Sequence, residues 1–129
     1  MRGFPIEVSA EASAAHAAAT VVDLHNDALT KLTHSWYDFS RRHGPATFYN
    51  PLRMDLDLPR IRAGGIHALG CLMFAGFHVA RQRRFWRQLD CAKALVAAYP
   101  EALALARTAG DIRAARAAGR VALFLGVEG

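Results

Sequence analysis

Two short apolar runs near opposite ends of the chain lead into side chains that bind metal ions. Residues 21–24 lead into His25 and Asp27, and residues 121–127 lead into Glu128. Apolar runs of this length, rich in β-branched residues, predict buried strands. Side chains two residues apart in a strand point to the same side, so His25 and Asp27 are placed to bind one ion together. A strand ending in His-x-Asp therefore predicts part of a metal site.

The rest of the sequence alternates helical and strand-like patterns. Ser9 predicts an N-cap, Asp57 and Gly64 predict the start and stop of a short helix, and Asp111 and Gly119 do the same for the last helix. The predicted helices are residues 9–19, 29–39, 57–64, 85–99, 101–107 and 111–119, and the predicted strands are residues 20–25, 66–75 and 120–126.

This order predicts an α/β fold with about three parallel strands joined by crossover helices. Residues 1–19 form a helical lead-in, and residues 20–129 form the first three strand/helix units of one domain. Right-handed crossovers bring all carboxyl ends of parallel strands to one edge of the sheet. We therefore expect His25, Asp27 and Glu128 to meet at that edge.

Composition limits the class of protein. A chain that is 53% hydrophobic and 21% charged is typical of a globular domain. No stretch approaches the roughly 20 apolar residues that span a bilayer, and the N-terminus lacks the apolar core of a secretory signal. We therefore expect no membrane span and a cytoplasmic location. Cys71 and Cys91 lie in apolar contexts, which predicts buried, reduced thiols.

Arginines account for much of the formal charge of +5, and four of them crowd into residues 81–87 beside Phe85 and Trp86. Such a cluster is able to contact nucleic acid by neutralising phosphates and stacking on bases. The alternative is a solvated loop and first helical turn whose Phe85 faces the core. Acidic residues elsewhere leave no extended basic surface, so we favour the second interpretation and expect no nucleic-acid partner.

The chemistry of the predicted site suits Zn²⁺, which accepts imidazole nitrogen and carboxylate oxygen. The two oxygens of Glu128 are able to bridge two ions, although this residue also suits a helix cap or an ion pair with an arginine. A two-metal site lowers the pKa of a shared water and polarises a carbonyl, which favours hydrolysis of an amide or ester. Asp23 lies within the strand and is interpreted as a supporting carboxylate.

Four other histidine positions carry different expectations. His78 lies at the same edge as the predicted ligands and is a candidate for lining a substrate pocket. His67, at the start of the second strand, is expected to be structural, and His34 and His43 are expected to be solvated or to cap the chain.

Three segments of the chain resemble motifs of the membrane dipeptidase (renal dipeptidase) metallopeptidases of the amidohydrolase superfamily. In the family's order, these segments are residues 22–29, residues 57–66, and residues 105–113 together with 119–129. The resemblance implies the N-terminal part of a (β/α)₈ TIM barrel with a binuclear zinc centre that hydrolyses dipeptides, as a homodimer when full length. By position, His25 and Asp27 match ligands of one zinc, and Glu128 matches the bridging carboxylate. Leu24 departs from the family's usual glycine, and residues 69–74 depart from its usual Gln-Phe-Trp character.

A complete barrel of this kind needs about 250 residues, so three strands are expected not to close. The family's later histidine ligands, catalytic aspartate and substrate-binding arginine match no residue here, and no catalytic residue is assigned. We expect an N-terminal fragment that is inactive alone. Two alternatives stay open: another amidohydrolase-type metal hydrolase, against which Asp27 argues because many carry His-x-His, and a non-catalytic basic binding module.

Overall fold

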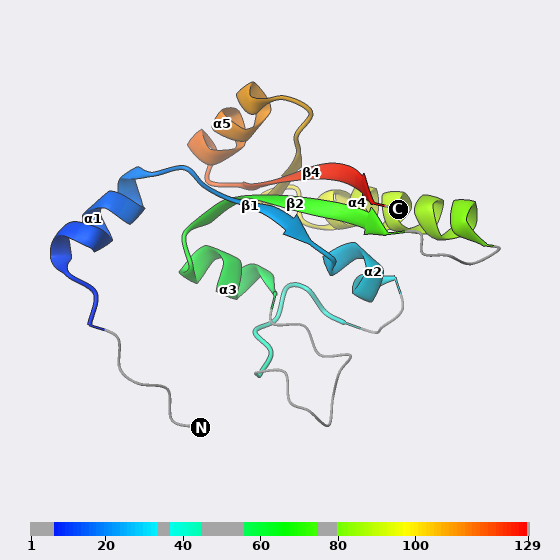
Figure 1. Ribbon diagram of the computed structural model, residues 1–129, viewed down its shortest axis with the longest axis horizontal. Coiled ribbons are helices and arrows are strands. Elements are labelled where there is room, and N and C mark those ends of the chain that lie inside the picture. The colour runs from blue at the N-terminus through cyan, green and yellow to red at the C-terminus, as the bar shows by residue number, and fades with distance from the viewer. Residues whose placement is uncertain (1–6, 34–36, 45–55, 75–79, 129) are drawn as a thin grey trace.

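The computed structural model describes residues 7–33, 37–44, 56–74 and 80–128 and contains one parallel sheet with helices on both faces (Figure 1). The strands are β1 (Val21–Asn26), β2 (Ile66–Phe74), β3 (Leu103–Leu105) and β4 (Val121–Glu128), in the order β1-β2-β4-β3. Every pairing is parallel. The predicted α/β class is therefore confirmed, and the four-stranded sheet does not close on itself.

In the part of the chain that the structure describes, five helices flank these strands: α1 (Ala10–Ala18), α2 (Ala28–Leu32), α3 (Leu58–Ala63), α4 (Arg81–Ala98) and α5 (Ala109–Ala117). The predicted caps of the first and third helices are confirmed. Ser9 Oγ accepts from the Ala12 amide, Asp57 accepts from the Arg60 amide, and α3 ends at Gly64. No helix in the described part of the chain is both long enough and apolar enough to cross a membrane.

The segment predicted as a helix over residues 101–107 is instead a turn followed by strand β3. Leu103 pairs with Val121 and Leu105 with Leu123, so β3 lies along the first half of β4. The segment after Pro100 is too short for a stable helix, and its backbone groups gain partners at the open edge of β4. The sheet consequently has four strands where the sequence predicted about three.

Three other predicted boundaries differ from the structure. Helix α2 ends at Leu32, and residues 37–44 form turns, although Phe39 is buried as its helical spacing suggested. Helix α4 begins at Arg81, so the arginine cluster is helical from its first residue. The N-cap of α5 is Thr108, and Asp111 closes a capping box by accepting from the Thr108 amide.

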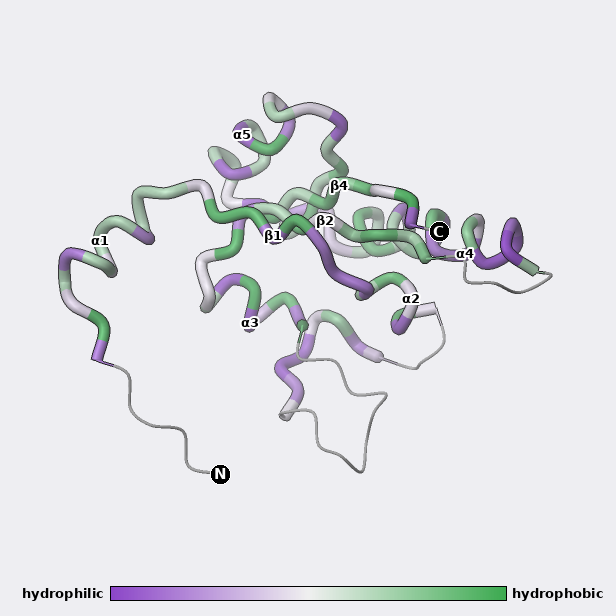
Figure 2. Tube along the Cα trace, in the orientation of Figure 1, coloured by the Kyte–Doolittle hydropathy of each residue, from purple (hydrophilic) through white to green (hydrophobic). Residues whose placement is uncertain are grey.

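The main core lies on the face of the sheet that α2, α3 and α4 cover. Leu69, Cys71 and Leu123 from the strands are fully buried there. Figure 1 shows α5 on the opposite side of the sheet from α2 and α3, where it packs on small residues such as Ala68 and Ala122. Figure 2 shows mostly hydrophobic colouring along β2 and β4, as expected when both faces are covered, whereas the end of β1 is hydrophilic.

The two cysteines are free thiols, as predicted. Cys71 is buried and Cys91 is half-buried, and neither forms a disulfide. Burial raises the pKa of the Cys71 thiol to about 12, which keeps it protonated at neutral pH.

Candidate metal centre

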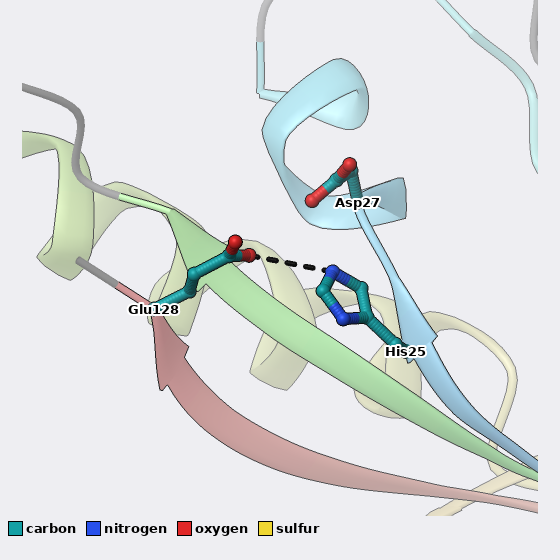
Figure 3. Close-up of side chains that lie close together, drawn as sticks. All are labelled: His25, Asp27 and Glu128. Carbon is teal, nitrogen blue, oxygen red and sulfur yellow. Dashed lines mark ion pairs between the residues drawn. The ribbon is translucent and has the colours of Figure 1, made fainter.

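The carboxyl ends of β1 and β4 bring together two side chains from opposite ends of the chain. His25 Nε2 lies 3.4 Å from Glu128 Oε2, and both side chains are about half exposed to solvent. Figure 3 shows the imidazole of His25 pointing toward the carboxylate of Glu128 across the end of β2. The fold therefore brings His25 and Glu128 together at one edge of the sheet, as the sequence predicted.

A bulge in β1 directs His25 into this position. Asp23 pairs with Leu69, but Asn26 pairs with Cys71, so Leu24 and His25 lie opposite the single residue Gly70. A Cβ at position 70 would lie 2.7 Å from the Leu24 carbonyl carbon and closer still to its oxygen. Only glycine leaves room for the bulged backbone to approach β2 this closely.

Asp23 and Asn26 fix the turn that carries His25 and Asp27. Asp23 Oδ1 accepts from the His25 amide at 3.0 Å, and Asp23 Oδ2 accepts from Asn26 Nδ2 at 3.1 Å. Asn26 Oδ1 accepts from the Ala28 amide at the start of α2. The interpretation of Asp23 as a supporting carboxylate matches these contacts, whereas the role of Asn26 was not predicted. The signal for it was an Asn immediately before a helix start, where its side chain forms an Asx turn.

Asp27 is the N-cap of α2, but its carboxylate makes no capping hydrogen bond. An aspartate at this position ordinarily accepts from the amides of the first helical turn. Asn26 accepts from the first amide instead, and the Asp27 carboxylate lies beside His25 (Figure 3). His25, Asp27 and Glu128 each offer one ligand atom, and the three atoms lie within 4.8 Å of one another.

This donor set fits a divalent cation. One imidazole and two carboxylates are a combination found in zinc sites. With bonds of about 2.1 Å, two ligands of a tetrahedral ion lie about 3.4 Å apart, and the His25–Glu128 separation of 3.4 Å matches this value. The carboxylates of Asp27 and Glu128, whose ligand oxygens lie within 4.8 Å of each other, would repel each other, and a cation between them removes that cost.

The other predicted residues lie elsewhere. His67 Nδ1 accepts from the Val21 amide at 3.1 Å, and burial lowers the pKa of His67, so this residue is structural as predicted. His43 stacks on Tyr37 with ring centroids 4.0 Å apart. His34 and the substrate-pocket candidate His78 lie outside the described residues.

The arginine cluster is helical from Arg81 onward and not a loop, but Phe85 faces the core as predicted. It forms the first turns of α4, and Phe85 packs against the core while Trp86 remains exposed.

Comparisons with known proteins place this geometry in context. The sequence model of the family described as membrane dipeptidase (peptidase family M19) matches residues 9–129. The solved structure of the "probable dipeptidase PvdM" from Pseudomonas aeruginosa matches with a TM-score of 0.62 and 16% identity, over 91% of this chain and 30% of that one. An amidohydrolase from Pseudomonas aeruginosa matches with a TM-score of 0.53 and 17% identity, over 90% of this chain and 28% of that one. No curated protein matches the sequence.

The two solved structures share the fold of this chain at low sequence identity. The chain spans about 30% of their length. Its open four-stranded sheet corresponds to a part of each of those longer chains, which is consistent with the predicted partial barrel.

Proposed function

The chain belongs to the membrane dipeptidase family (peptidase family M19), and from this premise we propose that it carries the first metal ligands of a zinc-dependent dipeptidase. Family membership supports a metal-dependent hydrolase in general. The specific proposal of a zinc site depends on one observation, the convergence of His25, Asp27 and Glu128, and dipeptide substrates are proposed from the family's description. These three side chains offer nitrogen and oxygen donors of the kind that zinc accepts.

Each residue has a distinct task in this proposal. His25 would hold the ion through Nε2, while Asp23 accepts from the His25 backbone amide and holds the bulge in place. Asp27 contributes a carboxylate oxygen that is free of helix capping. Glu128 has two oxygens, one toward His25, and is proposed as the carboxylate shared between two ions. His78 is proposed to line the substrate pocket.

Zinc bound here would supply Lewis-acid chemistry, polarising a peptide carbonyl and lowering the pKa of water. The chain's own residues position that chemistry at the carboxyl edge of the sheet, which is where active sites of (β/α)₈ barrels form. No catalytic acid or base is proposed among residues 1–129. We accordingly expect these residues by themselves to bind zinc and to hydrolyse no dipeptide.

Zinc titration of the 129-residue chain tests the proposal. We expect His25→Ala and Glu128→Gln each to weaken zinc binding at least tenfold, because each removes one of three ligands. Glu101→Gln, an exposed glutamate after α4, is the matched control and should bind like the wild type. Binding that is equally tight in His25→Ala would refute the assignment of the site.

A second assay addresses the activity. A longer polypeptide that includes the remaining barrel strands should hydrolyse dipeptides, and chelation should abolish the turnover. Turnover by residues 1–129 alone would contradict the proposed division of the site. The homodimer and the cytoplasmic location remain predictions from the sequence.

A further inference from the structure

We propose that Gln88 is a positioning residue that holds the Asp27 side and the Glu128 side of the metal centre at a fixed separation. This inference rests on the proposed function. Gln88 lies in the first half of α4 and is 2% exposed, although its neighbours on that helix face, Phe85 and Ala92, are apolar. A polar side chain this deeply buried requires a physical reason.

Gln88 forms hydrogen bonds to two separate elements, α2 and β2. Together these two bonds form the Gln88 bridge. Thr30 Oγ1 donates to Gln88 Oε1 at 3.0 Å, and Gln88 Nε2 donates to the Phe74 carbonyl at 2.8 Å. A third, longer contact of 3.4 Å joins Nε2 to the Arg84 carbonyl within α4. Both ends of the amide are therefore satisfied inside the core.

The two elements that the Gln88 bridge joins carry the two halves of the metal centre. Thr30 lies in α2, three residues after Asp27, the N-cap of that helix. Phe74 is the last residue of β2, and its partner in the sheet register is Glu128. One side chain thus connects the element that begins at Asp27 to the backbone position beside Glu128.

This connection adds a directional contact to the apolar contacts that Leu29 and Leu32 of α2 make with the core. The helix has five residues, too few to be stable without tertiary contacts. Apolar contacts are non-directional, so they define the position of α2 along the core less sharply than hydrogen bonds do. Hydrogen bonds at both ends of one rigid amide specify a distance, and a small shift of a supporting group is enough to weaken metal binding.

Zinc affinity of folded variants tests the bridge. Gln88→Met preserves the side-chain length but removes both bonds, and we expect it to weaken zinc binding about tenfold. Thr30→Val removes the hydrogen bond from Thr30 Oγ1 to Gln88 and should weaken binding about threefold. Gln82→Met, on an exposed position of the same helix, is the control and should leave the affinity unchanged. Affinities are compared where urea titration shows each variant to be fully folded.

A double-mutant cycle distinguishes positioning from simple packing. If Gln88 acts by placing Asp27, Gln88→Met should weaken zinc binding less than twofold in an Asp27→Asn background, because the ligand it positions is already lost. The same fold-loss with and without Asp27 would overturn the inference. If Gln88→Met does not fold, Thr30→Val in the same cycle decides the question.

The outcomes also separate this inference from the proposed function. Zinc binding that is insensitive to His25→Ala counts against the metal centre itself. Zinc binding that depends on His25 but is unchanged in folded Gln88→Met overturns the Gln88 bridge alone.

Discussion

Gly70→Ala is the substitution that most directly tests how the sheet presents His25. Gly70 lies in β2 opposite the bulge of β1. An added Cβ would lie 2.7 Å from the Leu24 carbonyl carbon and 2.8 Å from Phe124 Cζ. Carbon atoms in contact ordinarily lie about 3.5–4.0 Å apart, so β1 would have to move away from β2 by a substantial part of an ångström.

The size of the effect follows from which atoms must move. Overpacking a core by one methyl group costs about 1–3 kcal/mol. The obstacle here is backbone of a hydrogen-bonded strand, so we expect a loss near the upper limit, about 3 kcal/mol. Because β1 carries His25, the displacement should also separate His25 from Glu128 and weaken zinc binding about tenfold or more.

Urea denaturation of the metal-free protein measures how much Gly70→Ala lowers the free energy of unfolding. With an m-value of about 2 kcal/mol/M, a loss of 3 kcal/mol lowers the midpoint by about 1.5 M urea. Gly126→Ala, in the neighbouring strand β4, is the matched control. Its Cβ would meet only Leu72 Cδ2, at 2.6 Å, the far end of a flexible side chain that is able to rotate away. Equal, small losses in both variants would refute the argument from the bulge.

Three further predictions concern stability. Burial raises the pKa of Asp57, but hydrogen bonds from the amides of His43 and Arg60 and from the Arg60 side chain outweigh this effect and hold that pKa below its ordinary value. The ionised carboxylate therefore stabilises the fold fully above about pH 4, and this contribution is lost as the pH falls through the lowered pKa. Asp57→Asn should flatten the acid limb of a plot of unfolding free energy against pH. An unchanged limb would contradict the prediction. Thr108→Ala removes the capping box of α5 and should cost about 1 kcal/mol in urea denaturation, whereas Ser9→Ala should cost far less because α1 buries no residue. Helix α4 has no acidic residue in its first turn, so Arg81→Glu should raise the unfolding free energy by about 0.5 kcal/mol through the helix dipole, and a gain that persists in 1 M salt would point to another cause.

Much of the fold was predictable because the strands are strongly apolar and the helix starts carry recognisable caps. Residues 66–74 and 121–127 are almost continuously apolar, and such strands are expected in a parallel sheet whose two faces are both covered. The same parallel order predicted that His25 and Glu128 meet at one edge, since right-handed crossovers leave no alternative.

The differences arise where tertiary contacts decide the local structure. Leu103 to Leu105 form a strand only because β4 offers an unpaired edge, which local propensity does not reveal. The bulge at Leu24 and His25 depends on a close approach to Gly70 in another strand. Gln88 could not be predicted from its helix face alone, because neighbouring residues such as Phe85 and Leu89 are apolar, although a polar residue at that spacing is a signal in itself.

The most direct test of the metal centre is an anomalous difference map from crystals of the protein grown with zinc and measured at the zinc absorption edge. We predict a peak about 2.0–2.2 Å from a ring nitrogen of His25 and from carboxylate oxygens of Asp27 and Glu128. A zinc peak held by other side chains, with His25 and Glu128 left apart, would contradict the account.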